Sequence, residues 1–285
     1  MEVADSIAAL GQWRESAPGR LGVVPTMGAL HDGHLSLARR ARAECDRVVV
    51  TIFVNPAQFG PHEDLAAYPR DLPRDFELLR REATDLVFTP TEPMIYPRGF
   101  SSWVSVEQLS DRWEGVSRPG HFRGVATVVL KLLNLVGAQR AYFGEKDYQQ
   151  LRVVERLVRD LNVPTTIVPC PTVREPDGLA MSSRNAYLSA PDRGAAPVLW
   201  RGLSAARDAY RAGERDGDTL ARSIREVIER EPRARVDYVG VADPATLEPV
   251  KRIEHAAVCL VAAWLAKVRL IDNLVLAPAQ EEPTP

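Results

Sequence analysis

The sequence predicts an α/β protein with a parallel sheet, followed by a smaller α+β domain. In the first half of the 285 residues, short apolar runs alternate with helix-length segments, the pattern of βαβ units. After about Arg174 the pattern changes to two successive helices and then three strand-like runs. We therefore place a domain boundary near Pro176, with residues 1–175 forming the larger domain and residues 176–285 the smaller one.

The strands expected in the larger domain are short runs of apolar and β-branched residues. The strongest is Arg47–Val54, whose sequence RVVVTIFV is typical of a strand buried on both faces. Alternation of such runs with helices favours a parallel sheet. The expected strands are Leu21–Thr26, Arg47–Val54, Asp85–Thr89, Ser102–Val106, Arg140–Phe143 and Thr165–Val168.

The expected helices have recognisable starts, stops or apolar faces. Pro73 suits the first turn of a helix, and Gly137 suits the position after a last turn. The helices expected in the larger domain are His34–Cys45, Asp71–Ala83, Phe122–Val136 and Glu145–Leu161. The smaller domain is expected to contain helices Ala190–Arg211 and Asp218–Arg230, strands Arg235–Val241, Ala257–Ala262 and Lys267–Leu276, and a frayed end at Glu281–Pro285.

Composition and charge argue against several classes of partner. Apolar residues make up 45% and charged residues 26% of the chain, as in ordinary soluble proteins, and the formal net charge is −2. This balance predicts no binding to nucleic acid or to a membrane, and no segment has the roughly 20 apolar residues of a membrane helix. The N-terminal segment lacks the apolar run of a signal peptide. The three widely spaced cysteines, Cys45, Cys170 and Cys259, predict buried thiols in a reducing compartment, so we expect a cytoplasmic protein.

The first candidate site is Pro25–His34 (PTMGALHDGH), which follows a strand and opens a helix. Gly28 permits close approach of the backbone to a ligand, and a helix start favours anions. His31 and His34 can donate hydrogen bonds to phosphate oxygens, and a protonated imidazole adds positive charge. Taken alone, the two histidines fit ordinary packing at least as well, and a metal pair is a further option, although no His-Glu-x-x-His spacing supports a zinc hydrolase. Their position favours a ligand, because strand-to-helix turns are where α/β sheets bind ligands.

The second candidate is Gly144–Gln150 (GEKDYQQ), which also follows a strand and opens a helix. Lys146 suits the charge of a phosphate, and Asp147 can accept from a ribose hydroxyl or hold a metal. Gln150 can bind a hydroxylated substrate because its amide both donates and accepts. The segment also fits an ordinary helix start, in which acidic side chains complement the dipole.

Three further segments place polar side chains in turns. Met181–Asn185 (MSSRN) carries two hydroxyls and a guanidinium that suit a phosphate clamp. Phe53–Gly60 carries Asn55 and Gln58 at the end of the strongest strand, and Arg118–Gly124 is a basic turn before a helix. Each pattern is weak alone, since capped turns, polar loops and solvated arginines are common. Five polar turns around one sheet nevertheless favour a phosphate-bearing ligand, most simply a nucleotide, and leave the acceptor unidentified.

These segments resemble the pantothenate synthetase family, a branch of the nucleotidyltransferase-like Rossmann group. The resemblance covers nearly the whole chain, in order, through Pro25–His34, Phe53–Gly60, Arg118–Gly124, Tyr142–Gln150, Val173–Asn185 (VREPDGLAMSSRN) and Arg269–Leu274 (RLIDNL). Such long strings are far more specific than a lone His-x-x-His. The resemblance implies a Rossmann-like ATP- and pantoate-binding domain over residues 1–175, a C-terminal lid domain over residues 176–285, and a homodimer.

The reaction implied by the resemblance joins pantoate to β-alanine in two steps. ATP and pantoate first give pantoyl adenylate and pyrophosphate, and the amine of β-alanine then displaces AMP to give pantothenate. By resemblance, His34 and Lys146 stabilise the negative charge that builds on the α-phosphate. Mg²⁺ is implied as a bridge between phosphate oxygens, held mainly through ATP.

The resemblance also assigns the remaining contacts. The phosphates are gripped by His31, Ser182, Ser183 and Arg184, of which His31 and Arg184 count as catalytic together with His34 and Lys146. Gly144 and Asp147 hold the ribose, and Met27, Val173 and Met181 lie near the nucleotide. Gln58 and Gln150 bind pantoate, and Asn55 and Arg118 support the far side of its site.

Two other functions compete with this one. A related nucleotidyltransferase with another acceptor would make a dinucleotide or a CDP-alcohol, but the two glutamines and the Asn55 loop suit a small polyol acid better. A non-catalytic nucleotide sensor would keep the Gly-rich turns without needing His34, Lys146 and Arg184 together.

Overall fold

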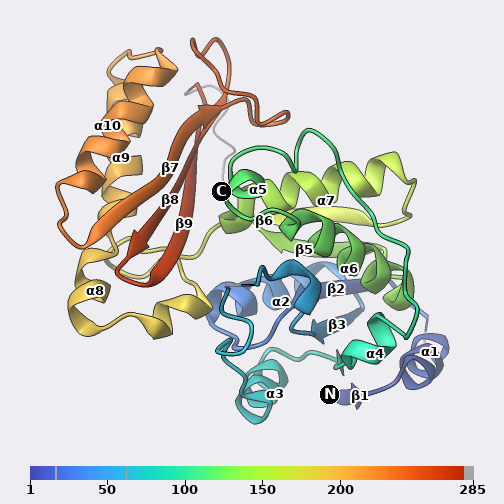
Figure 1. Cartoon of the computed structure of the whole chain (residues 1–285). Coiled ribbons are helices and arrows are strands. Elements are labelled where there is room, and N and C mark those ends of the chain that lie inside the picture. The colour runs from blue at the N-terminus through green and yellow to red at the C-terminus, as the bar shows by residue number, and fades with distance from the viewer. Residues whose placement is uncertain (17, 62, 279–285) are drawn as a thin grey trace. The chain divides into compact units, whose positions relative to one another are not determined.

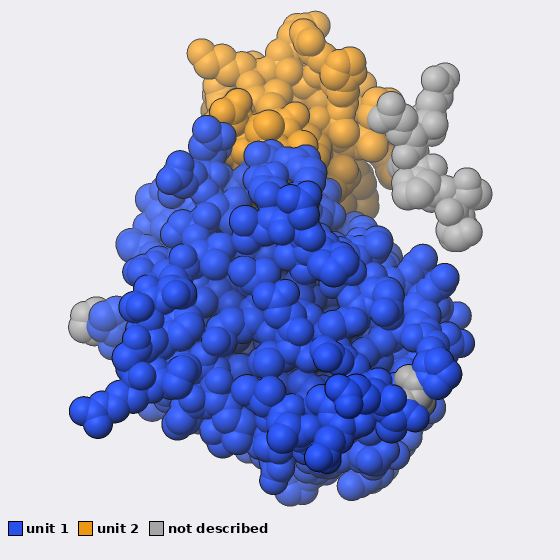
Figure 2. All heavy atoms as spheres, turned by 90° about the vertical axis from the view of Figure 1, so that its right-hand side faces the viewer, with its two compact units in different colours: residues 1–172 blue, residues 173–285 orange. Residues whose placement is uncertain are grey.

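The structure, a computed structural model, describes residues 1–16, 18–61 and 63–278. The chain divides into two compact units, unit 1 over residues 1–172 and unit 2 over residues 173–285 (Figure 2). Unit 1 contains a six-stranded parallel sheet, and unit 2 contains a three-stranded antiparallel sheet with helices. The predicted fold class is therefore confirmed. The expectation for Glu281–Pro285 falls outside the described residues.

The parallel sheet of unit 1 has the strand order β1-β4-β3-β2-β5-β6. Figure 1 labels its strands β2, β3, β5 and β6. Its strands are β1 (Glu2–Ala4), β2 (Leu21–Thr26), β3 (Arg47–Ile52), β4 (Leu86–Phe88), β5 (Arg140–Gly144) and β6 (Thr166–Cys170). From β2 the chain continues outward through β3 and β4, whereas β5 and β6 lie on the other side of β2. The winding direction therefore reverses between β2 and β5, which is where open α/β sheets bind ligands.

The two central strands separate toward their carboxyl ends. β2 pairs with β3 along its full length, from Leu21 to Thr26. Between β2 and β5, the described residues pair only at Gly22 with Arg140 and at Val23 with Ala141. The ends of β2 and β5, at Thr26 and Gly144, are thus not paired with each other, and the loops that follow them can present side chains to a ligand there.

Helices cover both faces of this sheet, because successive strand residues point to opposite sides. Val23 and Val49 belong to the core on one face, and Val24 and Val50 to the core on the other. The first face is covered by α1 (Ile7–Glu15), α6 (His121–Val136) and α7 (Tyr148–Asp160), and the second by α2 (Asp32–Glu44) and α3 (Leu72–Arg81).

Two of the predicted helix boundaries lie beside the residues expected to cause them, Pro73 at the start of α3 and Gly137 at the end of α6. Asp71 caps α3 by accepting the N–H of Arg74 at 3.1 Å, and Pro73 lies in the first turn. α6 ends at Gly137, which has a φ of 64° and donates to the carbonyl of Leu133. Both boundaries follow from local chemistry that the sequence displays.

The predicted strand at Ser102–Val106 is wrong. No strand is assigned there, because the segment runs along α6 instead of along a neighbouring strand. The N–H of Val104 donates to the hydroxyl of Thr127 at 3.0 Å, and Trp103 stacks on Tyr96 with 5.7 Å between ring centroids. The alternation of its residues reflects packing on a helix surface.

Several short elements of unit 1 have no counterpart in the prediction. β1 and α1 were not expected, and the helix expected at Glu145–Leu161 begins with a 3-10 turn. The remaining short helical elements are η1 (Pro56–Gln58), α4 (Glu92–Ile95), α5 (Glu114–Ser117) and η2 (Glu145–Asp147).

Unit 2 packs two long helices on an antiparallel sheet of order β7-β8-β9. The single helix expected at Ala190–Arg211 is wrong, since it is two helices that meet at Pro197, which lacks the N–H that a continuous helix needs. The elements of this unit are η3 (Ser183–Tyr187), α8 (Ala190–Ala195), α9 (Val198–Arg211), α10 (Gly217–Glu229), β7 (Ala234–Ala242), β8 (Ala257–Leu265) and β9 (Val268–Leu276).

Candidate active site

The loop after β2 is held in shape by its backbone and by a buried carboxylate. Gly28 and Ala29 have φ angles of 81° and 50°. Asp75 on α3 is buried and accepts the N–H groups of Ala29 at 2.9 Å and Leu30 at 2.8 Å. Burial raises the pKa of Asp75, and the two N–H groups partly oppose that shift. The chain therefore enters α2 in a defined orientation.

Two histidines stand at the start of α2. His31 is the residue before the helix and His34 lies in its first turn, with 4.1 Å between the ring centroids. The N–H of His31 donates to Nδ1 of His34 at 3.4 Å, so Nε2 of His34 carries the ring hydrogen and can donate to a ligand. Nδ1 of His31 is buried and has no hydrogen-bond partner among the described residues.

Both imidazoles are neutral near pH 7. Burial, and then the positive charge of Lys146, lower the pKa of His31 from 6.5 to about 4. Burial, and then the neighbouring His31, lower the pKa of His34 to about 3. The expectation that a protonated imidazole adds charge is therefore wrong for the free protein. The histidines supply hydrogen bonds, and Lys146 supplies positive charge.

Lys146 and Asp147 follow the carboxyl end of β5. Gly144 ends that strand, and η2 carries both side chains, with 3.5 Å between Nζ of Lys146 and Oδ1 of Asp147. The charges of both residues shift the pKa of His31, so the structure brings the two predicted strand-to-helix turns together. Gln150 lies half-buried in the first turn of α7.

Asn55 and Gln58 form a linked pair of amides after β3. Asn55 is buried; its Nδ2 donates to Oε1 of Gln58 at 3.0 Å and to the carbonyl of Gly124 at 3.2 Å. Its Oδ1 accepts from the hydroxyl of Tyr96 at 2.7 Å. Nε2 of Gln58 donates to the sulfur of Met27 at 3.1 Å, and a thioether is a weak acceptor. Asn55 therefore orients Gln58, whose donor can readily turn to a better acceptor.

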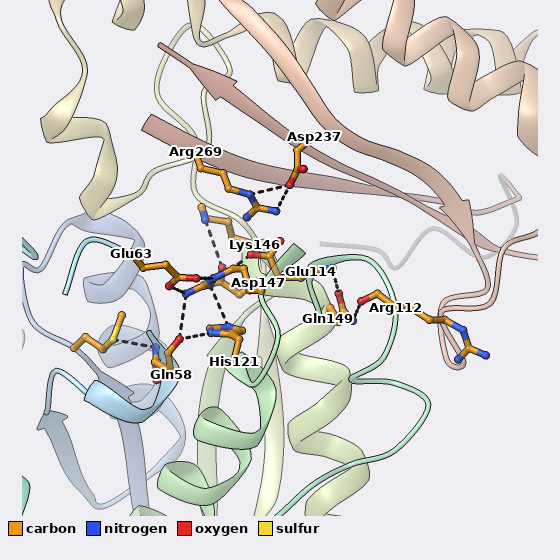
Figure 3. A network of polar contacts seen from close by, with 12 residues as sticks. Gln58, Glu63, Arg112, Glu114, His121, Lys146, Asp147, Gln149, Asp237 and Arg269 are labelled. Carbon is orange, nitrogen blue, oxygen red and sulfur yellow. Dashed lines mark hydrogen bonds and ion pairs between the residues drawn. The ribbon is translucent and has the colours of Figure 1, made fainter. Parts of the chain in front are cut away.

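Arg118 is held by acidic and carbonyl groups around the same loop. Figure 3 labels three of its partners, Gln58, Glu63 and His121. Its guanidinium pairs with both carboxylate oxygens of Glu63, at 2.8 and 2.5 Å, and donates to the carbonyl of Gln58 at 3.3 Å. Burial alone would raise the pKa of Glu63, but Arg118 lowers it below its ordinary value. His121 also contacts the carbonyl of Gln58, at 2.9 Å. Arg118 thus braces the backbone of Gln58.

The other predicted nucleotide contacts belong to unit 2. Val173 and Met181 are joined by a 3.0 Å hydrogen bond from the Met181 N–H to the Val173 carbonyl. Ser182 caps η3 by accepting the N–H of Arg184 at 3.3 Å. Ser183 and Arg184 are the first two residues of η3. We call residues 181–184 the phosphate loop, after the contacts that the family resemblance implies for them.

Sequence reasoning missed three residues that shape the site. Asp75 and Tyr96 act on segments far away in the chain, so no local pattern marks them. Gly124 lies where a β-carbon would come within 2.2 Å of the carbonyl oxygen of Ala57, next to Gln58. Its place in the Arg118–Gly124 motif was a clue, because a glycine inside a helix start often marks close backbone approach.

The described residues include no metal cluster and no membrane-spanning helix. Among the described residues, no three or more His, Cys, Asp and Glu side chains are grouped so that they could hold a metal ion. No helix in the described part of the chain has the length and apolar character needed to cross a membrane.

The fold and the site together define a class of protein. A doubly wound parallel sheet carries, at its switch point, a helix start, two neutral imidazoles and a lysine. Helix starts and lysines bind phosphate groups, and neutral imidazoles donate to them. Unit 1 is thus a Rossmann-like domain whose switch point suits a phosphate-bearing ligand.

Comparison with known proteins identifies the family. The family model for pantoate-β-alanine ligase matches residues 2–275. A pantothenate synthetase from Roseiflexus castenholzii is 54% identical over 273 residues, which cover 95% of this chain and 98% of the relative. One from Thermotoga neapolitana is 54% identical over 256 residues, covering 90% and 91%. The chain belongs to the pantoate-β-alanine ligase family.

Solved structures agree with this assignment. A crystal structure of pantothenate synthetase from Thermus thermophilus matches with a TM-score of 0.93 at 50% identity, covering 98% of this chain and 100% of the other. The pantoate-β-alanine ligase from Francisella tularensis, solved in complex with β-γ ATP and β-alanine, matches with a TM-score of 0.80 at 36% identity, covering 96% and 97%.

Proposed function

We propose that this protein condenses pantoate with β-alanine in an ATP-dependent reaction that proceeds through pantoyl adenylate. The observation that carries the proposal is the meeting of the His31–His34 pair with Lys146 at the switch point of the sheet. The family's name and the ATP and β-alanine complex of the Francisella relative support the same substrates.

In the first step, a carboxylate oxygen of pantoate attacks the α-phosphorus of ATP and pyrophosphate leaves. Negative charge increases on the α-phosphate oxygens as the new bond forms. The Nε2 hydrogen of His34 and the ammonium of Lys146 would stabilise that charge, together with the start of α2. His31, whose ring lies beside that of His34, would donate a ring hydrogen to the same phosphates.

In the second step, the amine of β-alanine attacks the carbonyl carbon of the adenylate and AMP leaves. A carboxylate is a poor electrophile, and adenylation gives it a good leaving group. Positioning and electrostatic stabilisation are sufficient physical means for this step, because the acyl group is already activated.

Pantoate would bind on the Gln58 side of the site. Nε2 of Gln58 rests on the sulfur of Met27, a weak acceptor, so a pantoate oxygen would replace it at little cost. Gln150 would hold a second pantoate oxygen. Asn55 and Arg118 would act on pantoate through Gln58, because their polar groups are engaged with the surrounding loops.

The nucleotide would be held by both units. Gly144 and Asp147 would contact the ribose, and Met27, Val173 and Met181 the nucleotide. We propose that unit 2 acts as a lid whose phosphate loop brings Ser182, Ser183 and Arg184 to the phosphates.

Mg²⁺ fits this site through its substrate. Mg²⁺ commonly keeps several waters and binds through substrate phosphates with one or two carboxylates. Asp147 is the carboxylate that the predicted site offers. When bound, the ion would neutralise phosphate charge.

We also propose a cytoplasmic homodimer. The three cysteines are free and buried, as suits a reducing compartment that supplies ATP. The homodimer rests on the family resemblance. Light scattering on the purified protein tests it, because a homodimer has twice the mass of one chain.

The decisive experiment is pyrophosphate release from ATP and Mg²⁺, with pantoate and β-alanine each present or omitted. We expect release that requires pantoate, with sustained turnover only when β-alanine is added. Release with another acceptor, and none with pantoate, would instead assign a different nucleotidyltransferase. ATP binding without release under any combination would support the sensor.

A further inference from the structure

The phosphate loop of unit 2 extends from a hairpin that is tied together by its backbone. Arg174 pairs with Ala180 in an isolated antiparallel bridge, and the N–H of Glu175 donates to the carbonyl of Leu179 at 2.8 Å. Gly178 closes the turn with a φ of 90°. We call residues 173–181 the hairpin. The phosphate loop begins at its last residue, so any change in the hairpin's position is passed to the loop.

One side chain fixes this hairpin to the sheet of unit 2. The guanidinium of Arg174 forms two hydrogen bonds to the carboxylate of Asp272 on β9, at 2.6 and 2.9 Å. It also donates to the carbonyls of Gly178 at 3.0 Å and Asn273 at 3.4 Å. The Asp272 side chain is only 3% exposed. Arg174 therefore joins the hairpin to the sheet through a fork that a lysine cannot reproduce.

An aromatic ring completes this attachment. Arg174 lies over the ring of Trp200 on α9, 3.8 Å from its centroid. The turn passes so close to the same ring that a β-carbon at Gly178 would lie 2.0 Å from its Cδ1. Sheet, helix and turn thus enclose the guanidinium, and it has one defined position.

The attachment continues into the phosphate loop. Nδ2 of Asn185 donates to the carbonyl of Ala180 at 3.1 Å, and the N–H of Asn185 donates to the carbonyl of Ser182 at 3.0 Å. Ser182 in turn accepts from the N–H of Arg184. A chain of hydrogen bonds therefore leads from Asp272 through the hairpin to the backbone of Arg184.

We propose that Arg174 and Asp272 are positioning residues for the reaction, which hold the phosphate loop in the orientation that ATP requires. This inference rests on the proposed function, in which Arg184 grips the phosphates. It also gives a role to the Arg269–Leu274 motif, which contains Asp272 and has no part in the proposed substrate contacts. Neither residue needs to touch substrate, because a small displacement of a loop is enough to impair transition-state contacts.

The variants Asp272→Asn and Arg174→Lys test this proposal. We expect each to lower kcat/KM for ATP by about 10- to 100-fold in pantoate-dependent pyrophosphate release, the size of effect that loss of precise positioning produces. The KM for pantoate should change less than about twofold, because its proposed contacts belong to unit 1. The matched control is Asp216→Ala, which removes the cap that α10 receives through the N–H of Thr219 and leaves the hairpin intact.

A double-mutant cycle separates positioning from general stabilisation. If Asp272 acts through Arg184, Asp272→Asn should cause no further loss in an Arg184→Ala background. If the losses of kcat/KM for ATP in the two single variants multiply fully in the double variant, the proposal is overturned. A fall in kcat/KM for ATP in Asp216→Ala as large as that in Asp272→Asn would also overturn it.

Amide hydrogen exchange provides a readout without catalysis. Asp272→Asn should speed exchange of the Met181 and Glu175 amides at least about tenfold relative to the amides of β8, whereas Asp216→Ala should not. Equal exchange in the two variants would overturn the attachment itself. If the wild-type protein releases no pyrophosphate with pantoate, the proposed function fails, and the exchange result alone decides whether the attachment holds the hairpin.

Discussion

The carboxylate of Asp75 accepts the backbone N–H of Leu30 at 2.8 Å, across 45 positions of sequence. The same carboxylate accepts the N–H of Ala29, so one buried side chain of α3 fixes the loop that leads to both histidines. The orientation of the histidines at the start of α2 therefore depends on a residue outside the predicted site.

Replacing Asp75 should damage both stability and adenylation. Asp75→Ala leaves two N–H groups without an acceptor, which we expect to lower the free energy of unfolding by about 1–3 kcal/mol. Pantoate-dependent pyrophosphate release should slow by at least ~10-fold, because the loop that orients the two histidines is no longer held in place. The control is Asp71→Ala, which removes the cap of the same helix and should lower stability by about 1 kcal/mol with activity retained. Equal loss of activity in the two variants would contradict a role for Asp75 in positioning the loop.

Lys146 and His34 should be the most sensitive positions for the first step. We expect Lys146→Ala and His34→Ala each to slow single-turnover adenylate formation by at least ~10²-fold, as happens when a preorganised transition-state donor is removed. His34→Gln tests whether His34 acts as a neutral hydrogen-bond donor. The glutamine amide also carries an N–H donor, so this variant should retain more activity than His34→Ala. Little change in the single-turnover rate for either alanine variant would remove that residue from the catalytic assignment.

Gln58 should control pantoate and leave ATP almost unaffected. In Gln58→Ala, the amide that rests on the Met27 sulfur is lost, so we expect the KM for pantoate to rise by ~10-fold or more, the cost of a hydrogen bond of about 1.4 kcal/mol. ATP binding, measured by calorimetry, should change little. Comparable losses of affinity for both substrates would show that Gln58 is no pantoate contact.

The fold could be predicted where local chemistry determines an element. β2 occupies the predicted Leu21–Thr26, and Gly137 stops α6 as expected, because apolar runs and glycine stops are local patterns. β1 could not be predicted, since three residues become a strand only by pairing with β4. The segment Ser102–Val106 has the alternation of a strand, but its amide at Val104 bonds to Thr127.

The candidate site was predictable only in part, for the same reason. Motifs such as Pro25–His34 display their polar groups in sequence, and the structure places them at one edge of the sheet together with Lys146. Asp75 and Tyr96 have no such motif, because their partners lie at distant positions. The charge state of the histidines could not be predicted from the sequence either, since their pKa values depend on how far the folded chain shields the rings from water.

Three histidines with lowered pKa values should make stability depend on pH in the acid range. The pKa of His34 is lowered to about 3, and those of His31 and His121 to about 4, from an ordinary value of 6.5. Between these values the unfolded chain binds more protons than the folded one, so stability is full above about pH 6.5 and falls as the pH drops toward 4. Each group contributes up to about 1.4 kcal/mol per pH unit. His34→Gln should make the pH dependence shallower when urea unfolding is compared at several pH values from about 4.5 to 7. Parallel profiles for the variant and the wild-type protein would contradict a His34 whose pKa is lowered in the folded protein.

Gly124 should tolerate no side chain, because α6 approaches η1 closely at this residue. A β-carbon there would lie 2.2 Å from the carbonyl oxygen of Ala57 and 2.7 Å from the N of Gln58. Since both are backbone atoms, relief requires movement of η1 itself, and we expect Gly124→Ala to lower the free energy of unfolding by about 1–3 kcal/mol. The displaced Gln58 should raise the KM for pantoate more than that for ATP.

Gly11 in α1 provides the matched control, because a β-carbon there would meet no atom within 4 Å. Gly11→Ala should stabilise unit 1 by about 0.5–1 kcal/mol, since alanine favours a helix interior. Urea unfolding and pantoate titration of the two variants separate the general effect of alanine in a helix from the close approach at Gly124. A Gly124→Ala protein as stable as Gly11→Ala, with an unchanged KM for pantoate, would show that the contact between α6 and η1 does not hold Gln58 in place.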